Sequence, residues 1–146
     1  IIYIPECFYY YKWRENSQGG EVRLGVAMPY MYEDFRAVWS YERLYYSIIG
    51  FTKAEYKQYD CKMLNRIATL MEGIFMSNNQ ISKGEKRKFV YDLSNDTLFK
   101  ELAVQDNVSS LRFYTKNIIK CIKKRNIIFL KIYLEVCKKI KNWRAP

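Results

Sequence analysis

Apolar residues recur at helical spacing between residues 53 and 77, and this pattern constrains the fold more than any other feature of the chain. They follow one another three or four residues apart, which places them on one face of an α-helix. Thr52 precedes the run and Glu55 follows three residues later, a capping box that satisfies backbone donors of the first turn. The pattern predicts a long helix that buries Tyr56, Tyr59, Met63, Leu64, Ile67, Leu70, Met71, Ile74 and Phe75.

Further helices are predicted on both sides of this one. Apolar residues recur at helical spacing from about Tyr30 to Ile49, and Gly50 follows as a natural stop. Ser82 and Glu85 form a second capping box, which opens a short helix, and Ser94-Asn95-Asp96 opens another. Two last helices are expected at about 108 to 124 and 127 to 141, joined at Lys124-Arg125-Asn126.

The first 20 residues differ from the rest. Residues 1–4 and 7–13 are rich in Ile, Tyr and Phe with Pro5 between them, which predicts two short extended segments, and residues 15–20 read as a turn. Because the chain opens on this run without a Met, we expect it to be the C-terminal piece of a larger protein. The predicted fold is mainly α, with a short β-hairpin or strand remnant (1–20), a helical subdomain (21–106) and a basic amphipathic helical tail (107–146).

The net charge of +10 lies entirely in the tail. Residues 1–106 hold 14 basic and 14 acidic side chains, whereas residues 107–146 hold 11 basic side chains against Glu135 alone. We expect docking on a membrane or a partner through Arg112, Lys116, Lys120, Lys123, Lys124, Arg125, Lys131, Lys138 and Lys139.

Several function classes are excluded or disfavoured by composition. The chain has no histidine, which removes the usual base of Ser or Cys nucleophiles and excludes hydrolase triads. Its four cysteines lie far apart without a Cys-x-x-Cys spacing, so we expect reduced core thiols and a cytoplasmic location, with disulfides or a metal site as the alternatives. No apolar run approaches the roughly 20 residues of a membrane-spanning helix.

One polar cluster follows the extended segments and suggests a binding site. Tyr11, Arg14, Asn16 and Ser17 offer a guanidinium, an amide and hydroxyls that together could grip an anion. The alternative interpretation is a polar turn that leaves an edge strand.

The stretch Ile4-Pro5-Glu6-Cys7-Phe8-Tyr9-Tyr10-Tyr11-Lys12-Trp13-Arg14-Glu15-Asn16-Ser17 resembles the end of the catalytic domain of bacterial family 2 (GT-A type) glycosyltransferases. The resemblance implies that Arg14 lies near the diphosphate of a nucleotide-sugar, with Tyr11, Asn16 and Ser17 supporting that loop. Many relatives carry His at the position of Arg14. The helical tail resembles the family only in its helical, tyrosine-rich and basic character.

The resemblance also implies what this chain lacks. The nucleotide-binding strands, the Asp-x-Asp pair that holds Mg or Mn, and the catalytic base should lie upstream of Ile1, so no catalytic residue is expected here and the fragment should not transfer sugar by itself. The adjacent acids Glu33-Asp34 are interpreted as a helix start, where carboxylates meet the helix dipole favourably. The implied partners are a nucleotide-sugar donor and a glycan or lipid-linked acceptor in surface polysaccharide biosynthesis.

The basic tail leaves several interpretations open. A helix with a broad apolar face and basic margins suits the surface of an anionic membrane, here the inner face of the cell membrane. The same face could pack on the preceding helices or on another chain, and self-association is plausible. The alternative function is a non-catalytic helical module that binds nucleic acid or a protein partner through its basic tail; no nucleic-acid motif supports this. The aromatics from Phe8 to Tyr59 are interpreted as core, with a sugar-stacking platform as the alternative.

Overall fold

The computed structural model describes residues 27–76 and 81–143, and this part of the chain is helical with no strand. The mainly-α prediction is therefore confirmed. The extended segments expected within residues 1–20 lie outside the described residues. The helices are α2 (Met31–Ile49), α3 (Lys53–Met76), α4 (Lys83–Asn95), α5 (Thr97–Leu102), α6 (Gln105–Ser110), α7 (Phe113–Lys123) and α8 (Ile127–Trp143).

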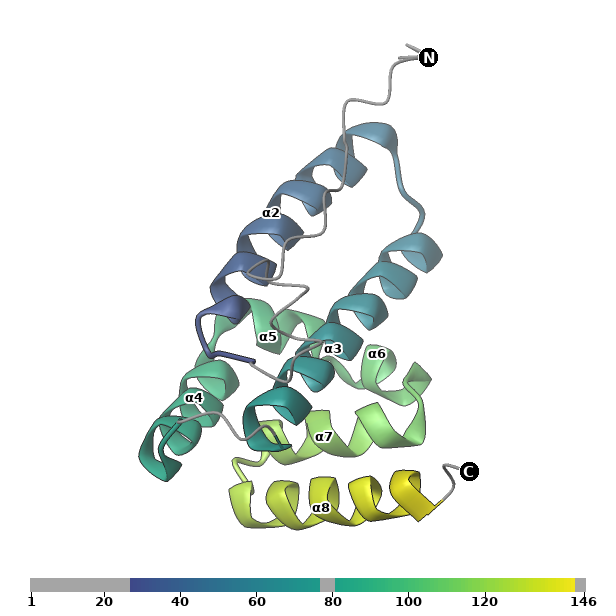
Figure 1. The fold of residues 1–146 in the computed structure, drawn as a ribbon. Helices are drawn as coiled ribbons and strands as arrows, with labels where there is room; N and C mark the ends of the chain where they lie inside the picture. The colour runs from purple at the N-terminus through teal and green to yellow at the C-terminus, as the bar shows by residue number, and fades with distance from the viewer. Residues whose placement is uncertain (1–26, 77–80, 144–146) are drawn as a thin grey trace, which may run out of the picture.

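Two antiparallel helix pairs organise the fold. The α2–α3 pair runs along the molecule, and the α7–α8 pair crosses it at the end far from the α2–α3 turn (Figure 1). At that turn Gly50 adopts φ 79°, a left-handed conformation that glycine accepts without strain, and its N–H donates to Tyr46 O. Thr52 then opens α3: Thr52 N donates to Glu55 Oε2 at 2.7 Å and Glu55 N donates to Thr52 Oγ1 at 3.3 Å. The predicted stop and capping box are confirmed.

The starts of α4 and α5 are also set by side-chain caps. Ser82 and Glu85 form the reciprocal capping box expected from the sequence. Asp96 caps α5 by accepting a hydrogen bond from Phe99 N at 2.8 Å. These local bonds fix both helix starts independently of distant contacts.

The single helix predicted over 108 to 124 is wrong, because the chain breaks at Leu111 and Arg112 between α6 and α7. The hydroxyls of Ser109 and Ser110 donate to Asp106 O, and Arg112 is extended with ψ 149°. Serine side chains compete for helix carbonyls in this way, which favours helix ends. The joint between α7 and α8 falls where predicted, with Asn126 Oδ1 accepting from Phe129 N at 3.0 Å.

One apolar core runs through all seven helices. Its side chains include Leu64, Ile67, Leu70 and Met71 of α3, Phe99 of α5, Ile118 and Ile119 of α7, and Leu130 and Leu134 of α8. The core therefore joins the predicted helical subdomain to the predicted tail. The thiols of Cys61, Cys121 and Cys137 are free, and burial raises the pKa of Cys61 and of Cys121.

Gly73 marks a close approach between α3 and the segment that enters α2. A Cβ at this position would lie 2.4 Å from the Cβ of the fully buried Ala27. Alanine adds roughly 1 kcal/mol of helix propensity, but overpacking costs about 1–3 kcal/mol. We expect Gly73→Ala to lower the free energy of unfolding by about 1 kcal/mol in urea denaturation.

Gly84→Ala is the matched control for this prediction. Gly84 is also helical, and its nearest neighbour, Ser82 Oγ, would lie 3.8 Å from the new Cβ, an ordinary contact. We expect Gly84→Ala to raise the free energy of unfolding by up to about 1 kcal/mol. If both variants raise the free energy of unfolding equally, α3 and the segment before α2 do not meet at Gly73.

Candidate functional site

The residues expected to grip a diphosphate, Tyr11, Arg14, Asn16 and Ser17, lie outside the described residues. Their role stays a prediction. The nine basic residues of the expected docking surface are all described. They lie at the start of α7 (Arg112), along α7 (Lys116, Lys120, Lys123), at the α7–α8 joint (Lys124, Arg125) and on α8 (Lys131, Lys138, Lys139).

Three of these basic side chains donate hydrogen bonds to residues outside their own helix. Lys116 Nζ donates to Ser109 O at 3.1 Å, and Lys123 Nζ donates to Ala103 O at 2.6 Å. Arg125 donates from Nε to Ser94 Oγ at 2.9 Å and from its terminal nitrogen to Asn95 Oδ1 at 2.6 Å. Its guanidinium also lies 4.5 Å from the centre of the Tyr91 ring, so it ties the α7–α8 joint to α4. These contacts give Lys116, Lys123 and Arg125 a structural role.

The outer face of α8 is apolar and exposed. Leu130 and Leu134 turn inward and are buried, where α8 packs on α3 and α7. Five large side chains turn outward and are 48–73% exposed: Ile128, Phe129, Ile132, Val136 and Ile140. Lys131, Lys138 and Lys139 border this arc, and Lys131 pairs with Glu135 at 3.7 Å. This strip of five apolar residues is called the α8 outer face below.

A second exposed apolar face lies on α2, and the residues that form it are uncharged. It consists of Val38, Tyr41, Leu44, Tyr45, Ile48 and Ile49, which are 46–76% exposed. The charged residues of this stretch turn toward α3 instead: Glu42 accepts a hydrogen bond from the Tyr59 hydroxyl, and the Arg43 guanidinium lies over the Tyr56 ring at 5.7 Å. The two exposed faces therefore differ in charge, and only the α8 outer face is edged by lysines.

A buried carboxylate connects α3 to α6. Asp60 is 8% exposed, and its Oδ2 accepts a hydrogen bond from Asn107 Nδ2 at 3.3 Å. Burial raises the pKa of Asp60, while the Arg43 charge and the donors on Asn107 and Trp39 oppose that rise. The Trp39 indole favours the ionised carboxylate, although no hydrogen bond of regular geometry joins it to Asp60 Oδ1 among the described residues.

The groove beside this carboxylate has mixed charge. It encloses about 520 Å³ and is lined by Arg43, Lys53, Lys57, Asp60, Glu101 and Asp106, among others. Lys57 pairs with Asp106 at 2.8 Å, and the Arg43 guanidinium lies 4.7 Å from the centre of the Trp39 ring and 4.0 Å from Glu101. Most of these charges form ion pairs with their neighbours. We therefore interpret the groove as a structural contact between α2, α3 and α6.

A hollow of about 540 Å³ at the start of α2 is organised around Asp96. The Tyr32 hydroxyl donates to Asp96 Oδ1 at 2.7 Å, and Arg36 Nε lies 3.7 Å from Asp96 Oδ2. Burial and the Asp96 carboxylate raise the pKa of Tyr32. The same carboxylate caps α5, so Asp96 joins α2 to α5.

Two features of these surfaces escaped the sequence analysis. Asp60 falls within the apolar helical pattern, four residues before Leu64, so a buried carboxylate was visible as a break in that pattern. Four basic residues of α4, Lys83, Lys86, Arg87 and Lys88, escaped because acidic residues elsewhere in residues 1–106 balance their charge.

The described residues contain neither a helix that is long and apolar enough to cross a membrane nor a group of acidic or cysteine side chains that could hold a metal ion. Comparisons with models of known families, with curated proteins and with solved structures gave no match.

Proposed function

We propose that this chain is the C-terminal helical region of a nucleotide-sugar-dependent glycosyltransferase of surface polysaccharide biosynthesis, and that α8 docks it on an anionic membrane surface. The enzyme class is supported by the resemblance at residues 4–17. The observation that carries the docking role is the α8 outer face, with five exposed apolar side chains edged by Lys131, Lys138 and Lys139. The described residues hold no group of side chains for the divalent metal of this enzyme class, whose Asp-x-Asp pair the resemblance places upstream of Ile1.

The physical basis of docking is the combination of apolar burial and charge attraction. A helix that lies in the plane of the membrane buries its apolar face among the lipid tails while basic side chains reach the headgroups. Each basic residue near an anionic surface adds roughly 1 kcal/mol. The α8 outer face and the lysines that border it supply both components. The exposed face of α2 supplies only the apolar one.

Co-sedimentation with vesicles tests the docking role. We expect the chain to sediment with vesicles that contain phosphatidylserine or phosphatidylglycerol but not with neutral vesicles. Ile132→Glu should weaken binding by about tenfold or more, because the apolar contribution of one large aliphatic side chain is about 1.5–3 kcal/mol. The matched control is Ile48→Glu, the same change on the exposed face of α2, which should bind as the unaltered chain does.

The same two variants test the alternative of a non-catalytic interaction module. The uncharged face of α2 supports this candidate, because apolar surface without charge favours a protein partner over anionic lipid. If Ile48→Glu abolishes self-association in sedimentation velocity while neither variant changes vesicle binding, the interaction module replaces the docking role. The enzyme class is tested separately, by the full-length gene. If that gene encodes no Asp-x-Asp at a strand end upstream of Ile1, the glycosyltransferase proposal is rejected.

A further inference from the structure

Four basic residues cluster in the first two turns of α4. Lys83, Lys86, Arg87 and Lys88 all fall within the first six residues of the helix, with Glu85 as the acidic residue among them. The first turn of a helix carries partial positive charge, so Lys83 is repelled rather than stabilised there, and the dipole gives the other three no stabilisation. The helix dipole therefore does not stabilise this concentration of charge.

Within the described ranges, these four side chains also have no anionic partner. The Lys86 ammonium lies over the Phe75 ring, 5.8 Å from its centre, and the side chains of Lys83, Arg87 and Lys88 are exposed. In contrast, Lys116, Lys123 and Arg125 are bonded to neighbouring helices. The charges available to an external partner thus lie on α4 as well as on α8.

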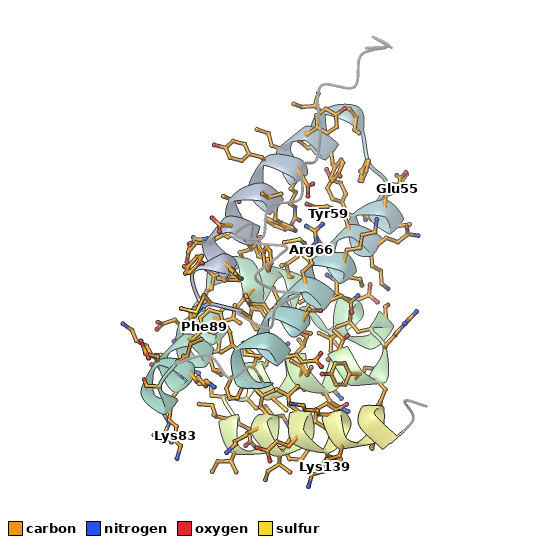
Figure 2. All side chains as sticks on the ribbon, in the orientation of Figure 1. Glu55, Tyr59, Arg66, Lys83, Phe89 and Lys139 are labelled. Atoms are coloured by element: carbon orange, nitrogen blue, oxygen red, sulfur yellow. The ribbon has the colours of Figure 1, made fainter. Side chains whose placement is uncertain are left out.

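The arrangement of the helices brings the two sets of charges to one side of the molecule. In Figure 2, Lys83 of α4 and Lys139 of α8 both lie at the lower edge, whereas Glu55, beside the α2–α3 turn, lies toward the opposite end. The start of α4 and α8 therefore lie at the same end of the molecule in this view.

We propose that the first two turns of α4 and the α8 outer face form one membrane-binding face, in which α8 supplies the apolar contact and α4 supplies much of the charge. This inference rests on the proposed docking role of α8 and adds a second contact to it. Anionic lipid is favoured over nucleic acid because the charges flank an exposed apolar strip, which a phosphate backbone would leave in water. The membrane then lies across the α7–α8 end, with the α2–α3 turn pointing away from it.

Neutralising the α4 charges tests the inference. We expect Lys83→Gln, Arg87→Gln and Lys88→Gln together to weaken binding to phosphatidylglycerol vesicles by about 100-fold in 0.15 M salt, since each charge contributes a factor of about 5. The matched control, Lys53→Gln, Lys62→Gln and Lys100→Gln, removes three exposed charges elsewhere and should weaken binding by less than about threefold. Should the triple variant fail to show native helicity, Lys83→Gln alone should weaken binding by about fivefold.

The outcomes separate this inference from the proposed function. If Ile132→Glu abolishes binding but the α4 variant binds as well as its control, α8 docks alone and the inference is overturned. Equal losses in both triple variants would also overturn it, because charge would then act without regard to position. If the unaltered chain binds no anionic vesicle but binds duplex DNA with strong salt dependence, both the docking role and this face are rejected.

Discussion

Phe99→Ala is expected to remove about 3–5 kcal/mol from the free energy of unfolding. Phe99 is 1% exposed and fills the space where the short helix α5 meets α3 and α4. Truncation to Ala loses the apolar contribution of the ring and leaves a cavity that the surrounding helices can only partly close. Since a domain of this size is stable by about 5–15 kcal/mol in total, the melting temperature should fall by roughly 10 °C or more.

Phe113→Ala provides the control for this prediction. It makes the same chemical change at the first residue of α7, where the ring is 75% exposed, so its effect should stay within about 0.5 kcal/mol. Thermal and urea denaturation, followed by circular dichroism, measure both variants. Similar losses in the two, or less than about 1 kcal/mol for Phe99→Ala, would contradict the placement of α5 in the core.

Features set by local chemistry could be predicted from the sequence. The two capping boxes and the Gly50 stop each depend on residues within one helical turn, and each forms as expected. The break at Leu111 and Arg112 could not be predicted in this way. Ser109 and Ser110 are compatible with a helix interior, and only their hydrogen bonds to Asp106 O favour the end of α6.

The exposed surfaces depend on tertiary packing and were harder to predict. Helical spacing placed Val38, Tyr45 and Ile48 on a helix, but it could not say that α3 would cover the opposite side, which holds Trp39. The bonding of the basic residues expected to dock also depends on tertiary packing. Arg125 and Lys123 look like surface cations in sequence, yet partners 31 and 20 residues away bind them.

Asn107→Asp should be the most damaging polar substitution at neutral pH. Asn107 Nδ2 donates both to Asp60 Oδ2 and to Leu102 O, at 3.3 and 2.9 Å. An aspartate would replace this donor with a second buried carboxylate beside the first, and would leave Leu102 O without its donor. Removing the partner of a buried charge costs about 3–5 kcal/mol, and we expect a loss of that size at pH 7.

The pH dependence of this loss follows from the pKa of the two carboxyls. Burial already raises the pKa of Asp60 above its ordinary value of 3.8, and a second carboxylate nearby should raise both pKa values further. The folded state then binds protons more tightly than the unfolded state, so stability falls as the pH rises above 3.8 and recovers as it is lowered. The unaltered chain should show the same sign with a smaller amplitude.

Urea denaturation at pH 7 and near pH 4.5 measures this recovery. Near pH 4.5 one shared proton lets the two carboxyls hydrogen-bond, so most of the loss in Asn107→Asp should disappear. Asn126→Asp is the control, because its exposed side chain caps α8 and aspartate caps a helix equally well; its effect should stay within about 0.5 kcal/mol at both pH values. A loss in Asn107→Asp that is the same at both pH values would mean that Asn107 acts through Leu102 O alone and that Asp60 is not the buried charge that connects α3 to α6.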